Sequence, residues 1–66
     1  MRNTIKVERA KRNMTQAALA DLIGVSRQTI NAIETSDYNP SVVLALKIAN
    51  VFNCSVHELF QLEGEK

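Results

Sequence analysis

The sequence predicts an all-α fold of five helices in a single domain that spans residues 1–66. Apolar residues recur at the spacing of three or four positions that is typical of helices over almost the whole chain. Aromatic residues make up only 5% of the sequence, so the core has to be aliphatic, which suits packed helices. A chain of this length buries a modest core and leaves no room for a separate ligand-binding domain.

A short polar break separates the first two predicted helices. The first runs from residue 5 to about residue 12. Thr15 is a good N-cap for the second, because its hydroxyl oxygen can accept a backbone N–H that the first helical turn leaves unpaired. Gly24 should end this helix, since glycine tolerates the left-handed conformation of a helix end. The apolar residues on one side of the second helix are Leu19, Leu22 and Ile23.

The third and fourth helices are separated by a polar loop over residues 35–39. The third is predicted from Arg27 to about Glu34, with Ser26 as its N-cap and two isoleucines, Ile30 and Ile33, on its inward side. The fourth opens at Pro40 and Ser41 and ends at Asn53. Its apolar residues repeat every three or four positions: Val43, Leu44, Leu46, Ile48, Ala49 and Phe52.

The C-terminal part of the chain predicts a short fifth helix and a possible strand. Ser55 caps a helix that continues through Phe60, and Glu58 three residues later completes a capping box. Gln61 and Leu62 can pair as a short strand with residues near Arg2–Thr4. Such a pairing would add a small two-stranded sheet made by the termini.

The formal net charge of +1 hides an uneven distribution. Residues 1–27 hold six basic and two acidic residues, a net charge of +4, whereas residues 28–66 hold two basic and five acidic residues, a net charge of −3. This asymmetry favours one face that meets a polyanion and another that is turned away from it. A solvated surface with a chance asymmetry explains the same counts.

Several classes of function find no support in the sequence. The single cysteine, Cys54, cannot form an internal disulfide, which fits a cytoplasmic location. His57 is three residues away, and the two side chains cannot close a zinc site by themselves. No catalytic triad, phosphate-binding glycine loop or pair of carboxylates can be recognised, so we expect no enzyme activity, no cofactor and no small-molecule effector. No stretch approaches the ~18 consecutive apolar residues of a membrane span.

The most informative segment is residues 16–35, QAALADLIGVSRQTINAIET. A helix-turn-helix needs two helices that cross at a steep angle through a turn of three or four residues. Ala20 is small where the second of these helices crosses the first, and Gly24 supplies the turn. The wedge between the helices is formed by Leu19, Ile23, Val25, Ile30 and Ile33. Together these features predict a DNA-binding helix-turn-helix.

Over about residues 5–60 the chain resembles the phage-repressor/Cro type of helix-turn-helix, the xenobiotic-response-element class. The stretches VSRQTINAIE, YNPS and LALKIA resemble more narrowly a compact stand-alone subgroup that includes the regulator of enterococcal cytolysin expression. The resemblance implies a lambda-repressor-like fold of five helices, with a small sheet from the termini. It also implies a homodimer that binds double-stranded DNA.

Placing the third helix in a major groove gives three side chains the role of reading bases. Arginine can bond guanine O6 and N7 in a bidentate pair, and glutamine and asparagine can do the same with adenine N6 and N7. The predicted base contacts are therefore Arg27, Gln28 and Asn31. The alternative is that these are ordinary exposed polar residues of a helix.

Phosphate contacts are expected from other groups. Gln16 resembles the family's phosphate-binding glutamine, at a helix N-terminus where backbone N–H groups and the helix dipole favour an anion. Lys11 and Arg12 either add long-range attraction or are simply solvated. The family usually has a glycine and a basic loop after its isoleucine-glutamate pair, whereas Ser36 and Asp37 follow here, and Asp37 would repel a phosphate. The remaining expected phosphate contacts are Ser26, Thr29, Tyr38 and Asn39.

Two further sets of residues are expected to act in structure and assembly. Arg9 and Glu34 resemble the family's paired arginine and glutamate, which join the first and third helices as a structural ion pair. Apolar residues near the C-terminus exceed what a small monomeric core must absorb, so a symmetric dimer can form there. The predicted dimer interface is Val56, Leu59, Phe60 and Leu62. The alternative is that all four complete the intramolecular core.

These observations predict a homodimeric transcriptional regulator that reads an inverted repeat in double-stranded DNA through its third helix. We expect a repressor that occludes a promoter, because simple occlusion needs the fewest parts. The alternative is an antitoxin-like protein-interaction module whose DNA binding is secondary. A third possibility, a general nucleoid- or RNA-binding role, is disfavoured by the near-neutral net charge, since nonspecific binding depends on many phosphate contacts.

Overall fold

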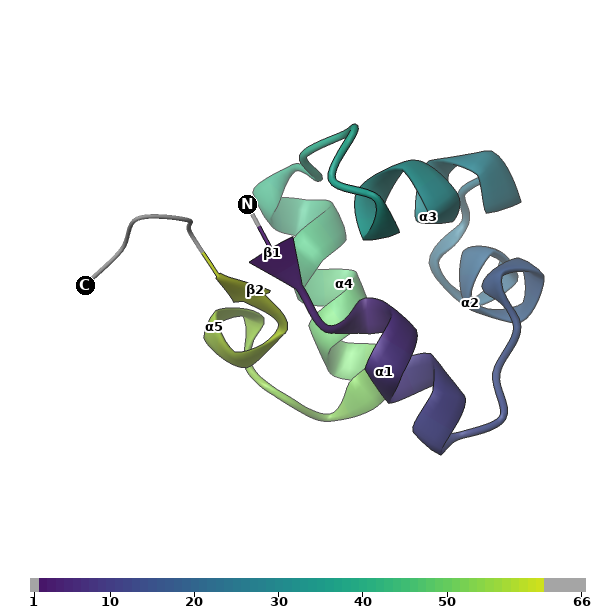
Figure 1. Ribbon diagram of the computed structural model, residues 1–66, viewed down its shortest axis with the longest axis horizontal. Helices are drawn as coiled ribbons and strands as arrows, with labels where there is room; N and C mark the ends of the chain where they lie inside the picture. The colour runs from purple at the N-terminus through teal and green to yellow at the C-terminus, as the bar shows by residue number, and fades with distance from the viewer. Residues whose placement is uncertain (1, 62–66) are drawn as a thin grey trace.

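The computed structural model describes residues 2–61. Its elements are β1 (Arg2–Asn3), α1 (Ile5–Lys11), α2 (Gln16–Ile23), α3 (Arg27–Glu34), α4 (Val42–Phe52), α5 (Val56–Leu59) and β2 (Phe60–Gln61). The α2–α3 pair lies at one end of the molecule and α5 with the two strands at the other, while α1 and α4 lie between them (Figure 1). The mostly helical architecture agrees with the fold class that the sequence predicts.

Hydroxyl side chains set the start of four helices. Each accepts a hydrogen bond of 3.0–3.1 Å from the backbone N–H three residues further on. This contact pairs an N–H group that the first turn of a helix otherwise leaves without an acceptor. At α5 the carboxylate of Glu58 also accepts from the backbone N–H of Ser55 at 2.9 Å, which completes the predicted capping box. The four N-caps are Thr15, Ser26, Ser41 and Ser55.

Among residues 2–61, four have a positive φ, and each of them follows or ends a helix. Gly24 has a φ of 76° at the end of α2, as the sequence predicts. Asn13 and Asn53 follow α1 and α4 with φ values of 52° and 55°, and asparagine tolerates this region better than most residues. Ser36 has a φ of 65° after α3, at a position where serine has no such advantage.

The core lies between all five helices and is almost entirely aliphatic, as predicted. Phe52 is its one aromatic side chain among the described residues. The wedge predicted between α2 and α3 is buried at four of its five positions, and Val25 packs against it while half-buried. The buried cluster consists of Ile5, Leu19, Ala20, Ile23, Ile30, Ile33, Ile48, Ala49, Phe52 and Leu59.

Some apolar residues lie outside this core. Leu22, which the sequence places on the same side of its helix as Leu19 and Ile23, is 63% exposed. Val43 and Leu46 belong to the apolar repeat of α4 but are 64% and 52% exposed. The reason is geometric: successive residues in a helix are about 100° apart, so residues three and four positions apart spread over more than one face.

The ends of the described chain form a two-stranded antiparallel sheet. Arg2 pairs with Gln61, and Asn3 pairs with Phe60. The prediction was wrong in two details: α5 ends at Leu59 instead of Phe60, and β2 begins one residue earlier than expected. A capped single turn is complete within four residues, which leaves Phe60 free to adopt the extended backbone of a strand. The predicted strand residue Leu62 lies outside the described residues.

Asn3 connects this sheet to the end of α3. Its side-chain Nδ2 donates to the carbonyl of Ile33 at 2.8 Å, and its Oδ1 accepts from the backbone N–H of Ile5 at 3.3 Å. Next to it, the backbone N–H of Thr4 donates to the carbonyl of Leu59 at 2.9 Å. The C-terminal turn of α3 is therefore held by a side chain from β1, a contact that no local pattern in the sequence announces.

No helix within residues 2–61 has the length and apolar character needed to cross a membrane.

Candidate nucleic-acid interface

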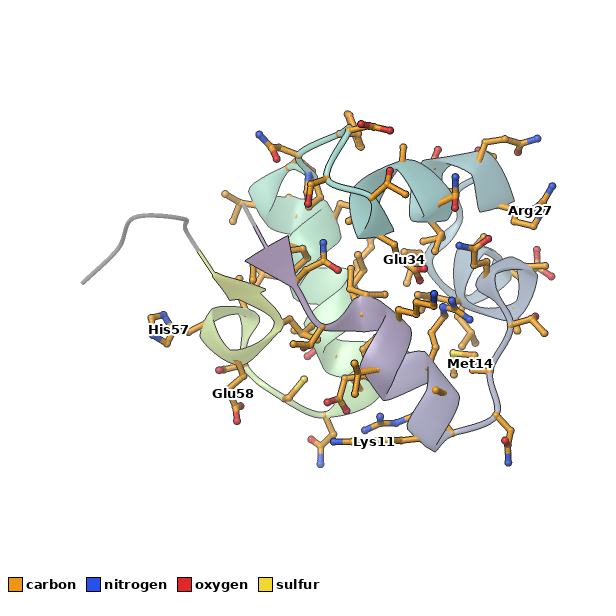
Figure 2. All side chains as sticks on the ribbon, in the orientation of Figure 1. Lys11, Met14, Arg27, Glu34, His57 and Glu58 are labelled. Carbon is orange, nitrogen blue, oxygen red and sulfur yellow. The ribbon has the colours of Figure 1, made fainter. Side chains whose placement is uncertain are left out.

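The outer side of α3 carries the three residues that the sequence assigns to base reading. Arg27, Gln28 and Asn31 are all exposed, whereas Ile30 and Ile33 on the opposite side of the helix are 0% exposed. Figure 2 shows the Arg27 side chain at the N-terminal end of α3, directed away from the body of the molecule. The apolar side of α3 packs into the core, and its polar side therefore faces the solvent.

An ion pair joins α3 to α1 on the inner side of α3. Arg9 Nε donates to Glu34 Oε2 at 2.6 Å, and Arg9 Nη2 donates to Glu34 Oε1 at 3.1 Å. The side chains are 13% and 6% exposed, and Glu34 points from α3 toward α1 (Figure 2). The hydrogen bonds to Glu34 raise the pKa of Arg9, against the smaller opposing effect of burial. This is the ion pair that the sequence predicts between the first and third helices.

The same arginine also fixes the start of α2. Arg9 Nη1 donates to the backbone carbonyl of Met14 at 2.8 Å, just before the N-cap Thr15. The guanidinium therefore contacts α3 through Glu34 and the α1–α2 connection through Met14. The part-buried guanidinium of Arg9 thus links α1 to α3 and to the start of α2.

Gln16, the first residue of α2, connects the part-buried ion pair of Arg9 and Glu34 to the outer side of α3. Its side-chain Nε2 donates to Glu34 Oε1 at 3.1 Å and to Asn31 Oδ1 at 3.2 Å. A residue expected to bind phosphate is thus bonded to a residue expected to read a base. We call these two hydrogen bonds the Gln16 bridge.

The other residues expected to contact phosphate lie at the two ends of α3. Ser26 caps the N-terminus, and its hydroxyl also lies 2.9 Å from the Thr29 hydroxyl. The backbone N–H groups of a first helical turn, with the helix dipole, favour an anion at such an end. Beyond the C-terminus of α3, Tyr38 is 47% exposed and Asn39 is exposed in the loop that leads to α4.

Asp37 has a local role in that loop. Its Oδ2 accepts from the Thr35 hydroxyl at 3.0 Å, and its backbone N–H donates to the carbonyl of Ala32 at 2.9 Å. The backbone N–H of Tyr38 donates to the same carbonyl at 3.2 Å. The aspartate therefore stabilises the turn after α3, while its charge disfavours a phosphate near it.

Arg12 and Lys11 are engaged in structural contacts. Arg12 Nη2 donates to the carbonyl of Phe52 at 2.7 Å, and its guanidinium lies 4.9 Å from the centre of the Phe52 ring. Glu8 accepts from Arg12 at 2.8 Å and from Lys11 at 3.3 Å, and these bonds lower the pKa of Glu8, the bond to Arg12 most. Arg12 thus ties α1 to the end of α4. The four-residue spacing of Glu8 and Arg12 was the available signal in the sequence.

The residues expected at a dimer interface fall into three groups. Leu59 is 0% exposed and belongs to the core, so it is not available to a partner, and the alternative of core completion applies to it. Val56 and Phe60 are half-buried and pack against the core. Leu62 lies outside the described residues.

Cys54 and His57 show no arrangement that resembles a reactive or metal site. Cys54 is half-buried, and burial raises the pKa of its thiol. His57 points away from α5 on the far side of the molecule from α3 (Figure 2). Within residues 2–61 no group of three His, Cys, Asp or Glu side chains is placed to hold a metal ion.

Comparison with known proteins extends over almost the whole chain. The family model described as Helix-turn-helix matches residues 5–59. A relative from Archaeoglobus fulgidus, described as an uncharacterized HTH-type transcriptional regulator, is 50% identical over 66 residues. This alignment covers 100% of the present chain and 93% of the relative.

Two solved structures have a similar fold. The P22 c2 repressor, determined in complex with a synthetic operator, superposes with a TM-score of 0.80 at 33% identity and covers 92% of this chain and 89% of its own. The N-terminal DNA-binding domain of SinR from Bacillus subtilis has a TM-score of 0.77 at 31% identity, with coverage of 92% and 90%. The similarity therefore includes the α2–α3 pair and the helices that support it.

Proposed function

The chain belongs to the Cro/C1-type helix-turn-helix family of DNA-binding transcriptional regulators, and we propose that it is a homodimeric repressor that reads an inverted repeat through α3. The observation that carries this proposal is the outer side of α3. Three side chains with base-reading chemistry, Arg27, Gln28 and Asn31, are exposed together there. The part-buried ion pair of Arg9 and Glu34 joins their helix to α1 on its inner side.

The P22 c2 repressor supports the choice of double-stranded DNA as the partner, since that protein was determined with an operator. On this proposal, α3 enters the major groove, and the groups at the ends of α3 and at the start of α2 contact the phosphates on either side. The phosphate contacts are few, because Arg9 and Arg12 are engaged in structural contacts and Asp37 opposes one. Specificity then depends on base contacts more than on bulk charge.

A homodimer is supported by the arrangement of the ends of the molecule. The α5–β2 end lies away from the α2–α3 pair, so a two-fold contact there holds two α3 helices apart instead of pressing them together (Figure 1). Val56 and Phe60 are the described apolar residues that this contact would use. Two α3 helices about 34 Å apart would match successive turns of one DNA face.

Single substitutions on α3 test the base-reading role. In competition binding against duplexes that differ at one base pair, we expect Arg27→Ala and Gln28→Ala each to cost about 1–3 kcal/mol at one position and to relax the preference there. Asp21→Ala, on the exposed side of α2 and outside the assigned contacts, is the matched control. An unchanged sequence preference in both α3 variants would refute the proposed interface.

A second candidate function, an antitoxin-like protein-interaction module, is favoured by one observation on α4. Val42, Val43 and Leu46 are 76%, 64% and 52% exposed on this helix, which is more apolar surface than isolated exposed residues would give. The double variant Val43→Ser with Leu46→Ser distinguishes the two candidates. If binding-site selection is unchanged and the solution mass stays that of a dimer, the α4 face is not needed for the proposed function.

A further inference from the structure

Asn3 links the strand β1 to the C-terminal turn of α3. Its Nδ2 donates to the backbone carbonyl of Ile33 at 2.8 Å across a separation of 30 positions, and this contact is part-buried. The carbonyls in the last turn of a helix have no partner within the helix, so they are open to such a donor. The same carbonyl also accepts from the backbone N–H of Ser36 at 3.1 Å, which is a local contact, whereas Asn3 comes from a distant element.

Both ends of the Asn3 amide are fixed by groups with only one possible hydrogen-bond role. A backbone carbonyl can only accept, so the N–H₂ end of the amide faces Ile33. A backbone N–H can only donate, so Oδ1 faces the N–H of Ile5, at 3.3 Å. One side chain therefore joins the start of α1 to the end of α3.

The backbone around Asn3 belongs to the end of the molecule that we propose as the dimer contact. Asn3 pairs with Phe60 in the terminal sheet, and the N–H of Thr4 donates to the carbonyl of Leu59 at 2.9 Å. Leu59 is 0% exposed, so this support is anchored in the core. Phe60 is one of the apolar residues assigned to the dimer contact. Asn3 thus extends from the proposed dimer contact to the helix that carries the base-reading residues.

The position of α3 relative to this end matters for a symmetric dimer. The helix packs chiefly against α2, which lies away from the α5–β2 end (Figure 1). The distance and rotation between the two α3 helices of a dimer decide which spacing of half-sites fits. One additional base pair moves a half-site by about 3.4 Å along the DNA and turns it by roughly 35° around the axis. A small displacement of α3 therefore changes which spacing is bound best.

We propose that Asn3 is a positioning residue that fixes α3 relative to the dimer contact, and so decides which spacing between DNA half-sites the dimer accepts. This inference rests on the proposed function of a dimer that reads an inverted repeat. Without the bond to Ile33, the C-terminal turn of α3 loses its direct link to the terminal sheet, and the two α3 helices of a dimer move more freely. A looser dimer accepts spacings that a rigid dimer rejects.

The test measures binding of the purified protein to duplexes with the same two inverted half-sites, taken from binding-site selection. The half-sites stand at the preferred spacing and at one base pair more and one fewer. Asn3→Asp is the central variant: its carboxylate still accepts from the Ile5 N–H but has no donor for the Ile33 carbonyl, and a negative charge at the start of α1 suits the helix dipole. Asn3→Ala removes both bonds. Lys6→Ala, at an exposed position in the first turn of α1, is the control.

We expect the unaltered protein to bind the preferred spacing on the order of tenfold more tightly than either neighbouring spacing. In Asn3→Asp and Asn3→Ala this ratio should fall to about threefold, because one hydrogen bond that resists the displacement of α3 is lost. The base preference within a half-site and the dimeric solution mass should stay unchanged, and Lys6→Ala should keep the full ratio. If the Asn3 variants do not fold, the unaltered protein still tests the inference, since equal binding at all three spacings would overturn it.

Two results with the variants would also overturn the inference. Full discrimination between spacings in Asn3→Asp would show that the bond to Ile33 does not set the spacing. A uniform loss of affinity at all spacings, with the ratio intact, would show that Asn3 only stabilises the fold. Failure of the proposed function is seen with the unaltered protein instead, as a monomeric solution mass or as no enriched sequence, and it would remove this inference with it.

Discussion

Ser36 adopts a left-handed backbone conformation although it is not a glycine. Its φ is 65°, and the chain turns there from α3 into the loop before α4. The family resemblance places a glycine at this point, and glycine has no Cβ to oppose positive φ. Serine in place of the family's glycine therefore has a conformational cost. This cost is separate from the negative charge that Asp37 brings to the same loop.

Ser36→Gly should raise the free energy of unfolding by about 0.5 kcal/mol. It removes a left-handed penalty of roughly 1–2 kcal/mol, and part of this gain is lost through the greater freedom of glycine in the unfolded chain and through the interaction that Ser36 itself makes. Chemical denaturation measures the difference. Asn53→Gly, at a φ of 55°, is the matched control and should gain less, because asparagine already tolerates this region. A lower stability of Ser36→Gly would contradict this explanation.

The elements are positioned by a few polar contacts between residues far apart in the chain. Arg9 joins α1 to α3 through Glu34, and Asn3 joins β1 to the end of α3 at the Ile33 carbonyl. Both contacts support the same helix. We infer that the orientation of α3 depends on them as much as on the apolar wedge beneath it.

Glu34→Ala should destabilise the protein by about 3–5 kcal/mol, because it leaves the Arg9 cation, whose side chain is only 13% exposed, without its partner. This is most of the stability of a small domain, so the variant is expected to be largely unfolded in thermal denaturation. The double variant Arg9→Met with Glu34→Leu should recover much of the loss, since no charge is left buried. Lys11→Ala, which removes an exposed ion pair, should change stability far less. A stable Glu34→Ala protein with intact DNA binding would refute the structural role of the pair.

The capping box of α5 should make part of the stability depend on pH. The hydrogen bond from the Ser55 backbone N–H is the main reason that the pKa of Glu58 is lowered. A carboxyl group whose pKa is lower in the folded than in the unfolded state stabilises the fold above its unfolded pKa, and this stabilisation is lost as the pH falls through the folded pKa. We expect the contribution of Glu58 to the free energy of unfolding to stay constant from about pH 7 to about pH 5 and to decrease on further acidification to about pH 3. Glu58→Gln, which keeps an acceptor but does not titrate, should lose less over this range, and an equal loss in both proteins would contradict the assignment.

Local chemistry made several features of the elements predictable. The N-caps Thr15, Ser26 and Ser55 and the helix end at Gly24 depend on residues at most three positions apart, so the sequence contains all that decides them. The exposure of Leu22, Val43 and Leu46 was not predictable in the same way. Helical spacing shows that apolar residues share a helix, but which face meets the core is decided by the neighbouring helices.

The residue types of the candidate site could be predicted from the sequence, but the hydrogen bonds between its residues could not. The motif predicts that Arg27, Gln28 and Asn31 lie together on the outer side of the third helix, and all three are exposed there, while their role in reading bases stays a prediction. The Gln16 bridge joins residues 15 and 18 positions apart and exists only once α2 crosses α3. Arg12, placed among solvated or DNA-attracting residues, instead contacts Phe52 at a separation of 40 positions.

For the molecule as a whole, the structure changes what the charge asymmetry means. Two of the six basic residues in the first 27 positions, Arg9 and Arg12, are engaged in structural contacts, and Lys11 is paired with Glu8. Less positive charge is therefore available to a polyanion than the sequence count suggests. This agrees with a protein that recognises a particular site and binds other DNA weakly.

Selection of binding sites from a pool of random DNA duplexes with the unaltered protein tests the central claim most directly. The claim is that two copies of the chain read DNA sequence through their α3 helices. It predicts enrichment, at moderate salt, of an inverted repeat whose half-sites are centred about one helical turn, roughly 34 Å, apart. Enrichment of a single unrepeated site would contradict the dimer, and no enrichment at all would show that α3 is a scaffold helix and not a reader of DNA.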